Sequence, residues 1–339
     1  MIVEKTGTRL STTISNWNKV RYHLKNIQRD ASWRLGGNPV FSKKRTGARI
    51  LVYHGICQSD PLRFNTLFVR VADFESQLKL YKKYFNLISL DDFYNERFCN
   101  DRFNLCLTFD DGFANNYKYV LPLLEQYEVP AAFFITTIRD SGFDILWNDV
   151  LSIAYKFGPP AFEFRNKKYT RNAAGKYISA EGIYFADILR AGNFEMKAAM
   201  IKMFGHLKDR VDEDYWLQMT EAQIAELSTS KWVSIGSHGY YHSDMAKLET
   251  TAAEKELISS RRFLENITGK AIRALAFPYG SYSTPVVELC KKLGYSQLLA
   301  TDFINPGDGR DGTMRERFTV NPFISNINQA HANIFGSYR

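Results

Sequence analysis

Two adjacent carboxylates follow a buried-strand pattern in the first third of the chain. The apolar run at residues 105–109 ends at Asp110 and Asp111, and Gly112 comes directly after them. In α/β folds, functional residues gather just past the carboxyl ends of parallel strands, and a glycine there allows a sharp turn that aims both acids at one site. Two carboxylates side by side are costly unless a cation lies near them. The pattern therefore indicates either a metal site, with one acid left free as a base, or an ordinary Asp-Asp-Gly turn.

Two histidines follow a second apolar run. The run begins at Trp232 and ends at His238, and His242 comes four residues later. On one helical turn this spacing places both imidazoles on the same face, and a loop can reach the same geometry. Two neutral histidines and one carboxylate form a suitable ligand set for a divalent metal ion, and zinc is the ion that we expect. The second motif therefore favours a metal centre over two unrelated turns.

A third motif, Phe277-Pro278-Tyr279-Gly280, also ends an apolar run. In order and spacing the three motifs resemble those of polysaccharide deacetylases, the carbohydrate esterase family 4 enzymes, over roughly residues 46–325. The resemblance implies an α/β fold, a distorted (β/α) barrel of about seven parallel strands. It also implies a divalent metal used to hydrolyse acetyl groups on sugars. The pair Tyr53-His54 at the end of the first strand resembles the poly-N-acetylglucosamine deacetylase branch.

The resemblance implies a role for each polar residue of the motifs. It assigns the metal ligands to Asp111, His238 and His242. It assigns the base to Asp110, and the backbone N–H of Tyr279 is expected to help hold the oxyanion of the transition state. Because no C-terminal Leu-x-His motif follows, we expect His54 to be the general acid that protonates the leaving amine.

The sequence departs from the family pattern near the proposed base. Many members have an arginine two residues before the proline, where it contacts the base, but this chain has Ala276. We expect Arg317 or Arg315 to replace it from another loop. Gly239 stands where a serine or threonine usually follows the first histidine. These departures bear on substrate specificity more than on the type of reaction.

Contacts with the sugar are expected near the third motif and at one aromatic residue. The candidate residues are Phe277, Pro278, Tyr279, Trp147 and Arg317. An aromatic residue such as Trp147 can stack on a sugar ring, but an aromatic residue at such a position more often belongs to the hydrophobic core. The alternative for Tyr279 is a turn tyrosine behind Pro278.

Strand patterns alternate with helical ones along the chain, which predicts a parallel sheet. Strands are expected at 48–56, 87–90, 105–109, 131–137, 232–237, 271–277, 298–301 and 318–320. Helices are expected at 73–84, 115–127, 248–267 and 283–293. Residues 150 to about 230 form a mostly helical insertion with a hairpin near 162–169, and the motifs do not cover it. Such insertions often help to set substrate choice.

We divide the chain into a basic N-terminal extension (1–47), the barrel with its insertion (48–330) and a C-terminal tail (331–339). Apolar positions in the extension suggest an amphipathic helix, which either packs on the barrel or contacts an anionic membrane. The run Gly36-Gly37-Asn38-Pro39 predicts a linker after it.

Composition sets the broad class. The 339 residues are 45% apolar and 24% charged, as in globular proteins of one large α/β domain. The net charge of +8 suits an acidic partner, such as a glycan or an anionic membrane, but no basic run with interleaved aromatics indicates nucleic acid. The four cysteines form no Cys-x-x-Cys, so we expect reduced core residues. No run of about 18 apolar residues appears, and a cytoplasmic location is our default expectation.

Other functions remain open from the sequence. The enzyme could remove an O-acetyl or an N-formyl group from a sugar instead of an N-acetyl group. A relative that binds glycans without catalysis is a second alternative, although both aspartates and three histidines are retained. A non-haem iron oxygenase also uses two histidines and one carboxylate, but adjacent aspartates at a parallel-strand end argue against it.

Overall fold

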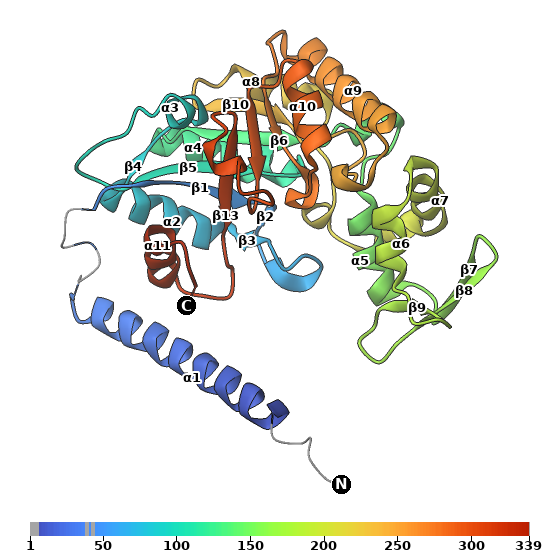
Figure 1. Cartoon of the computed structure of the whole chain (residues 1–339), viewed down its shortest axis with the longest axis horizontal. Helices are drawn as coiled ribbons and strands as arrows, with labels where there is room; N and C mark the ends of the chain where they lie inside the picture. Colours follow the sequence, from blue (N-terminus) through green and yellow to red (C-terminus); the bar gives the residue numbers. More distant parts are fainter. Residues whose placement is uncertain (1–6, 38–40, 42–44, 339) are drawn as a thin grey trace.

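A closed barrel of parallel strands forms the centre of the protein (Figure 1). The computed structural model describes residues 7–37, 41 and 45–338. The seven barrel strands are β1 (Ala48–Tyr53), β5 (Asn104–Phe109), β6 (Ala131–Ile135), β10 (Val233–Ser237), β11 (Ala274–Ala276), β12 (Gln297–Ala300) and β13 (Met314–Thr319). Each pairs in parallel with the next, and β1 pairs with both β5 and β13, which closes the sheet. The predicted (β/α) barrel is confirmed.

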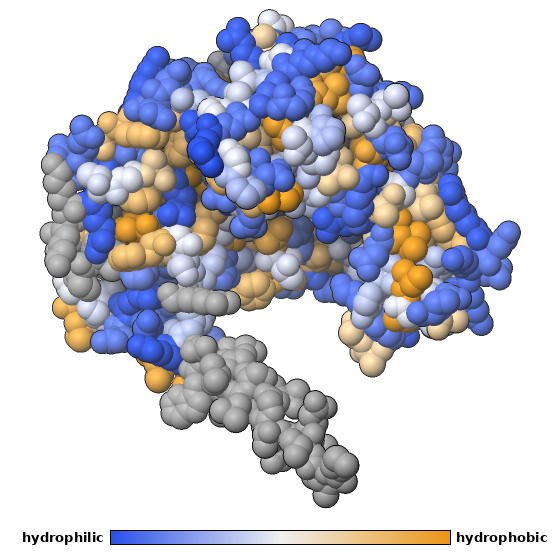
Figure 2. Space-filling view, in the orientation of Figure 1, coloured by the Kyte–Doolittle hydropathy of each residue, from blue (hydrophilic) through white to orange (hydrophobic). Residues whose placement is uncertain are grey.

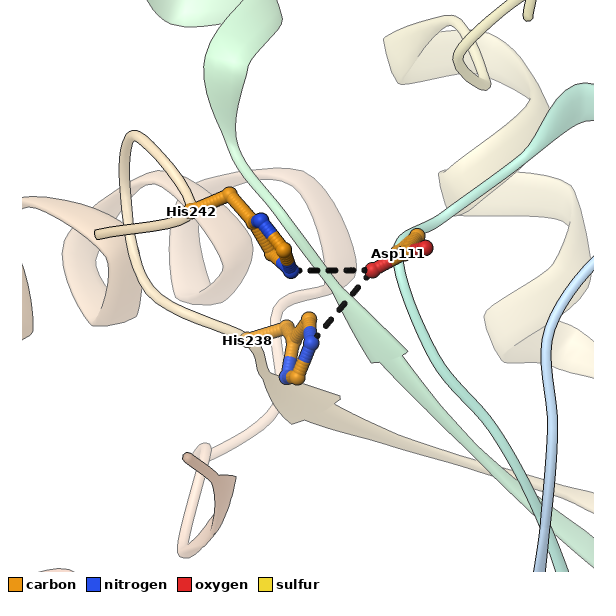
Figure 3. A group of neighbouring side chains, drawn as sticks. All are labelled: Asp111, His238 and His242. Carbon is orange, nitrogen blue, oxygen red and sulfur yellow. Dashed lines mark ion pairs between the residues drawn. The ribbon is translucent and has the colours of Figure 1, made fainter. Parts of the chain in front are cut away.

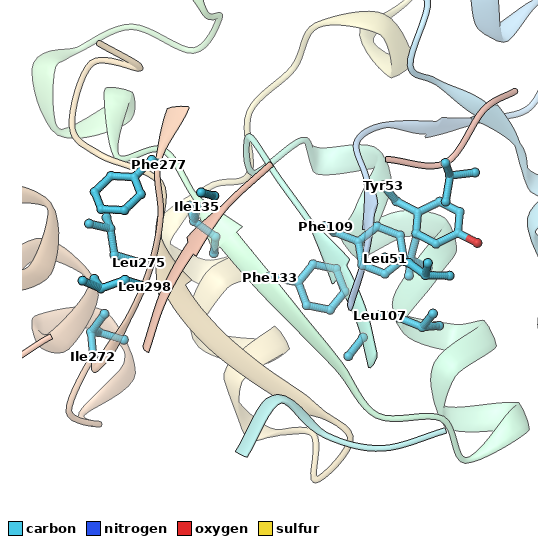
Figure 4. Packing of buried hydrophobic residues seen from close by; sticks show 14 of the residues in the cluster. Leu51, Tyr53, Leu107, Phe109, Phe133, Ile135, Ile272, Leu275, Phe277 and Leu298 are labelled. Carbon is cyan, nitrogen blue, oxygen red and sulfur yellow. The ribbon is translucent and has the colours of Figure 1, made fainter. Parts of the chain in front are cut away.

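Side chains alternate between the inside and the outside of the barrel, as the two-residue period of a strand requires. Outward-facing strand residues share one hydrophobic cluster with the surrounding helices. In that cluster the rings of Tyr53, Phe109 and Phe133, from three neighbouring strands, stack with centroid distances of 5.2 and 4.9 Å (Figure 4). Inward-facing residues such as Ile50 and Phe134 form a second cluster that fills the barrel. The interior is therefore a packed core, and chemistry is confined to its ends.

Helices cover the outside of the barrel and close its lower end, by which we mean the end where the strands begin. The covering helices are α2 (Val71–Tyr84), α4 (Leu121–Tyr127), α8 (Glu221–Thr229), α9 (Thr250–Thr268), α10 (Thr284–Lys292) and α11 (Asn326–Phe335). The strand predicted at 87–90 is wrong in part: β4 holds only Asn86–Leu87, and α3 (Leu90–Tyr94) starts where Ser89 caps it. The helix predicted at 115–127 begins with a π-helical turn (Asn116–Val120), and α4 follows with Pro122 in its first turn, a position that proline tolerates.

The insertion folds around a hydrophobic cluster of its own. It contains α5 (Trp147–Phe157), the antiparallel strands β7 (Ala161–Phe164), β8 (Lys167–Arg171) and β9 (Tyr177–Ser179), then α6 (Phe185–Ala191) and α7 (Phe194–Phe204). The predicted hairpin is confirmed as β7–β8, and a third strand extends it. These elements form a lobe beside the barrel in Figure 1, and Figure 2 shows hydrophobic residues on its surface. Because α8 packs on α9 and β10, the insertion ends before residue 221.

Helix α1 (Gly7–Arg34) lies outside the barrel beside α11, and its N-terminal half extends beyond it (Figure 1). Arg29 donates to Asn328 of α11 at 3.0 Å, and Trp33 packs edge-on against Tyr84 of α2. Asn38 and Pro39 of the predicted linker lie outside the described residues. The boundary drawn at residue 330 falls inside α11, so residues 331–335 are helix and not tail. Among the described residues, no helix combines the length and apolarity that crossing a bilayer requires.

Candidate active site

The two aspartates directly follow β5, at the rim formed by the carboxyl ends of the barrel strands, which we call the upper rim. Asp111 and Gly112 both adopt left-handed backbone conformations, with φ of 75° and 83°. A Cβ at Gly112 would lie 2.9 Å from the side chain of Ile135, so both the turn and the space favour glycine. The turn leaves Asp110 and Asp111 almost fully buried. The predicted sharp turn therefore directs both acids inward, and the strained φ of Asp111 is of the kind found at functional sites.

Three side chains converge at this rim and face one another (Figure 3). The Oδ1 of Asp111 lies 3.4 Å from Nε2 of His238 and 3.2 Å from Nε2 of His242. One ligand atom from each of the three residues lies within 4.8 Å of the others. His238 follows the last residue of β10, whereas His242 lies in the loop beyond it. The sequence motifs thus identified three residues that the fold brings together.

The second nitrogen of each imidazole is already engaged. Nδ1 of His238 lies 2.8 Å from the backbone oxygen of Ala276, so in this tautomer its N–H donates and Nε2 keeps a lone pair. Nδ1 of His242 lies 3.0 Å from the hydroxyl of Tyr279, which orients that ring in the same way. Metal-binding histidines are typically held like this by their other nitrogen. The donor set and its orientation therefore fit a divalent cation such as zinc.

Arg317 of β13 reaches Asp110 through the interior of the barrel. Its Nη1 and Nη2 each donate to one carboxylate oxygen of Asp110 at 2.7 Å, a bidentate pair. Arg315 lies on the same inward face of β13 but stacks on Tyr94 toward the lower end of the barrel. Of the two arginines proposed from the sequence, Arg317 is the one that contacts the predicted base. With both of its terminal nitrogens on Asp110, it orients the base and does not reach outward to a sugar.

The charged and buried groups of the site shift one another's pKa values. Burial alone would raise the pKa of Asp110, but Arg317 and His238 outweigh burial and hold that pKa below its usual value. Burial is likewise outweighed at Asp111, where the two facing imidazoles hold the pKa well below the ordinary range. Both acids are therefore ionised at neutral pH. The pKa of His242 is lowered by burial, which favours the neutral ring that a metal requires.

His54 comes directly after β1. Tyr53, the last residue of β1, pairs with Phe109, the last residue of β5, so His54 and Asp110 emerge at the same rim. The Nδ1 of His54 is buried without a hydrogen-bond partner among the described residues. Tyr279 lies across the site after β11, with a left-handed φ of 61°. Both residues are thus placed where a substrate between them could be reached.

Two of the predicted sugar contacts are core residues in the structure. Phe277 is fully buried and stacks on Tyr282 in the cluster outside the barrel, because the alternation of β11 turns it away from the rim. Trp147 is 4% exposed, and its indole N–H donates to the backbone oxygen of His242 at 3.4 Å. It therefore has the packing role that was its alternative. Pro278 is buried beside Tyr279, and only Tyr279 of these residues is partly exposed.

The insertion supplies charged residues near the site that sequence reasoning missed. Asp149, in the first turn of α5, is buried, and one of its oxygens has no hydrogen-bond partner among the described residues. Burial, and then the charge of Asp111, raises the pKa of Asp149 well above its ordinary value, so it is a second candidate acid. Lys197 of α7 is 2% exposed, and burial lowers its pKa to about 8. No spacing in the sequence links these residues to the histidine motif.

A closed parallel barrel with paired carboxylates and two histidines at its rim defines a hydrolytic barrel enzyme with a candidate metal centre. Residues 99–156 and 187–298, half of the chain, match the family model for polysaccharide deacetylases. The chain therefore belongs to the polysaccharide deacetylase family, whose members are hydrolases of amide bonds in acetylated sugars. The gap in the match, residues 157–186, holds β7, β8 and β9.

Several solved structures share the fold. The Streptococcus pyogenes deacetylase PplD in complex with acetate is 17% identical, with a TM-score of 0.55 over 85% of this chain and 97% of that chain. IcaB from Ammonifex degensii is 16% identical, with a TM-score of 0.53 over 85% and 97% of the two chains. BC0361, a polysaccharide deacetylase from Bacillus cereus, is 19% identical, with a TM-score of 0.52 over 86% and 69%. A search of curated protein sequences gave no match.

Proposed function

We propose that the protein hydrolyses the N-acetyl group of an N-acetylated sugar in a glycan or glycan precursor, with a divalent metal, expected to be zinc, held by Asp111, His238 and His242. The observation that carries the proposal is the convergence of these three donors beside an ionised Asp110. A cation bound there would polarise the acetyl carbonyl and lower the pKa of a water molecule to about 7.

Asp110 is the residue that accepts the proton of the attacking water. Arg317 keeps it ionised and fixes the direction of both carboxylate oxygens, so that no side-chain motion is needed when the proton is transferred. The backbone N–H of Tyr279 would donate to the oxyanion, a contact that in other enzymes contributes roughly 3 kcal/mol to the transition state.

An amide substrate also requires an acid, because an amine leaves only after its nitrogen is protonated. Two residues are available for this step. His54 approaches from β1, and Asp149 approaches from α5 of the insertion, where burial and the charge of Asp111 raise its pKa well above the ordinary value. An O-acetyl group leaves more readily without a proton, so the presence of acids beside the site favours the N-acetyl reaction.

Acetate release from a matched panel tests the proposal. We would compare N-acetylglucosamine oligomers, their O-acetylated and N-formylated counterparts, and protein stripped of metal and then reloaded. The expected result is metal-dependent acetate release that is fastest with the N-acetyl oligomers, and its loss in Asp110→Asn. Faster release from the O-acetyl or N-formyl substrates would replace the proposed substrate, and full activity of stripped protein would exclude the metal.

A further inference from the structure

Three consecutive residues of one loop are each contacted by a different helix of the insertion. The loop comprises residues 239–244, which we call the ligand loop because it carries His242. The backbone oxygen of His242 accepts from Trp147 of α5 at 3.4 Å. The hydroxyl of Ser243 accepts from the ammonium of Lys197 of α7 at 2.9 Å, and the carboxylate of Asp244 pairs with Arg190 of α6 at 2.8 Å.

The contacts of Trp147 and Lys197 are buried, whereas the Arg190 side chain is 38% exposed. On the loop itself Ser243 and Asp244 are 2% and 1% exposed. On the opposite side Glu256 of α9 accepts from the Ser243 hydroxyl and from the backbone N–H of Tyr240 and Tyr241. The loop also holds His242 at a φ of 51°, a conformation that a non-glycine residue keeps only when its surroundings impose it.

We propose that Lys197, Arg190 and Trp147 are positioning residues, through which the insertion holds the second histidine in its metal-binding orientation. The inference rests on the proposed metal site. Arg190 supports the imidazole of His242 through two contacts. It pairs with Asp244 of the ligand loop, and its guanidinium lies 4.3 Å from the ring centre of Tyr279, whose hydroxyl contacts Nδ1 of His242. The insertion is therefore part of the metal centre, and not only a surface that selects substrates.

Metal affinity measured by competition with a chromogenic chelator tests this role without relying on turnover. Lys197→Met keeps the aliphatic stem and removes the charge, and Trp147→Phe keeps the ring and removes the donor. The matched control is Lys208→Met. Lys208 lies in the same insertion, but its ammonium pairs with Asp144, at an N–O distance of 2.6 Å, and not with the ligand loop. We expect about tenfold weaker zinc binding in the first two variants, as for other residues that orient metal ligands, and a change within about twofold in the control.

The outcomes are decisive in each direction. Zinc affinity that is unchanged in both Lys197→Met and Trp147→Phe, or lowered equally in Lys208→Met, would overturn the inference. If Lys197→Met fails to fold, Trp147→Phe still decides the question. Failure of the parent protein to bind zinc would instead refute the proposed metal site itself.

A second and independent feature is an exposed apolar stripe on α1. Val20, Leu24 and Ile27 are 50%, 61% and 64% exposed, and their three- and four-residue spacing places them on one face of the helix. In the sequence the same spacing continues upstream at positions 17, 14 and 10. The opposite side of the helix is the one that packs on α11 through Arg29. Large exposed apolar residues that line up on one helix face usually mark an interaction site.

The charge of α1 indicates what covers this stripe. The helix carries six Lys or Arg residues and one Asp, a net charge of +5. Arg21, Lys25 and Arg34 are exposed around the stripe. Pairing two copies of this helix would bring like charges together, whereas an acidic surface would neutralise them.

We infer that α1 lies on an anionic lipid surface, with the stripe in the interface and its cations among the headgroups. The cytoplasmic leaflet of a membrane is a surface of this kind, which agrees with the cytoplasmic location expected from the sequence. The catalytic barrel would then be held near a membrane-bound glycan or glycan precursor.

Vesicle sedimentation of the full chain tests the inference, with phosphatidylcholine alone and with phosphatidylcholine mixed with phosphatidylserine. We expect binding only to the anionic vesicles, weakened by salt and lowered about fivefold for each cation lost in Arg21→Gln and Lys25→Gln. The double variant of Leu24→Ser and Ile27→Ser should also lose binding. Its matched control replaces Ile304, which follows β12, and Ile258 of α9 with serine; these residues are 58% and 36% exposed.

Equal binding to both vesicle types, no binding, or equal losses in the stripe and control variants would overturn the lipid assignment. A concentration-dependent dimer in sedimentation equilibrium that the stripe variants abolish would assign α1 to a second copy of the chain instead.

Discussion

The two histidines of the site are held by different parts of the molecule. His238 follows directly from β10, and its ring is fixed by the backbone of Ala276 on the neighbouring strand β11. His242 sits in the ligand loop, where its backbone and its two following residues are held by helices of the insertion. One proposed ligand is thus held by the barrel strands, and the other is held by helices that lie beside the barrel.

This difference separates what the barrel rim provides from what the helices of the insertion provide. The barrel rim carries the proposed base, its arginine and two of the three proposed metal ligands, within strands or directly after them. The insertion supplies the support of the third ligand and one candidate acid, Asp149. We expect changes at the rim to abolish chemistry, and changes in the insertion to weaken metal binding by degrees.

The largest effect is expected for the base. Asp110→Asn should lower kcat about 10³-fold, because an amide cannot accept the proton of water at neutral pH. Steady-state acetate release, with zinc content measured on the same sample, checks this. Zinc content should stay at the parent value. A variant that turns over at the parent rate would show that Asp110 is only a turn residue paired with Arg317.

The next largest effect is expected on zinc binding when either histidine is removed. His238→Ala and His242→Ala should each weaken zinc binding about 100-fold or more, since each removes a donor from a three-residue set. Adding Trp147→Phe should weaken binding further in the His238→Ala background but not in the His242→Ala background, because its effect passes through His242. Equal further losses in both backgrounds, measured by chelator competition, would contradict the division between barrel and insertion.

The identity of the general acid shows whether the barrel or the insertion protonates the leaving amine. His54→Ala should lower the rate on an N-acetyl sugar about 10²-fold and should affect an activated aryl ester much less, since that leaving group needs no proton. Asp149→Asn is the matched variant from the insertion. If Asp149→Asn shows the selective loss and His54→Ala does not, the acid comes from the insertion. Loss of zinc in His54→Ala would make His54 a ligand or a structural residue.

A smaller effect is expected from the arginine that supports the base. Arg317 helps to hold the pKa of Asp110 below its ordinary value. In Arg317→Met burial is less opposed, so the pKa of Asp110 should rise and the acid limb of the kcat–pH profile should move to higher pH. At neutral pH we expect about a tenfold loss or more. Arg315→Met, on the same strand face but in contact with Tyr94, is the control and should leave the limb in place.

Much of the fold could be read from the sequence, because burial leaves a local signature. The strand runs at 105–109 and 131–137 are continuous apolar stretches, as strands covered on both faces must be. The weakest prediction was the strand at 87–90, where Ser89 caps a helix and ends the strand pattern early. A short apolar run has no periodicity that separates a strand from the first turn of a helix.

The chain order of the motifs determined the main residues of the site. A polar residue that follows a buried parallel strand must emerge at the same rim as those following its neighbours, so Asp110, Asp111, His54 and His238 could be grouped without coordinates. His242 could be added because four residues reach no farther than the same rim. These are consequences of strand direction and chain length, which the sequence carries by itself.

Only the tertiary structure decided which groups support them. Arg315 and Arg317 both point into the barrel, and only the packing of its interior brings the side chain of Arg317 to Asp110 and that of Arg315 to Tyr94. Trp147, Arg190 and Lys197 lie scattered over fifty residues and meet the ligand loop through the packing of three helices. Phe277 and Trp147 turned out to be buried because side-chain direction depends on packing partners distant in the chain. No local pattern encodes such contacts, since they form between elements that the sequence separates.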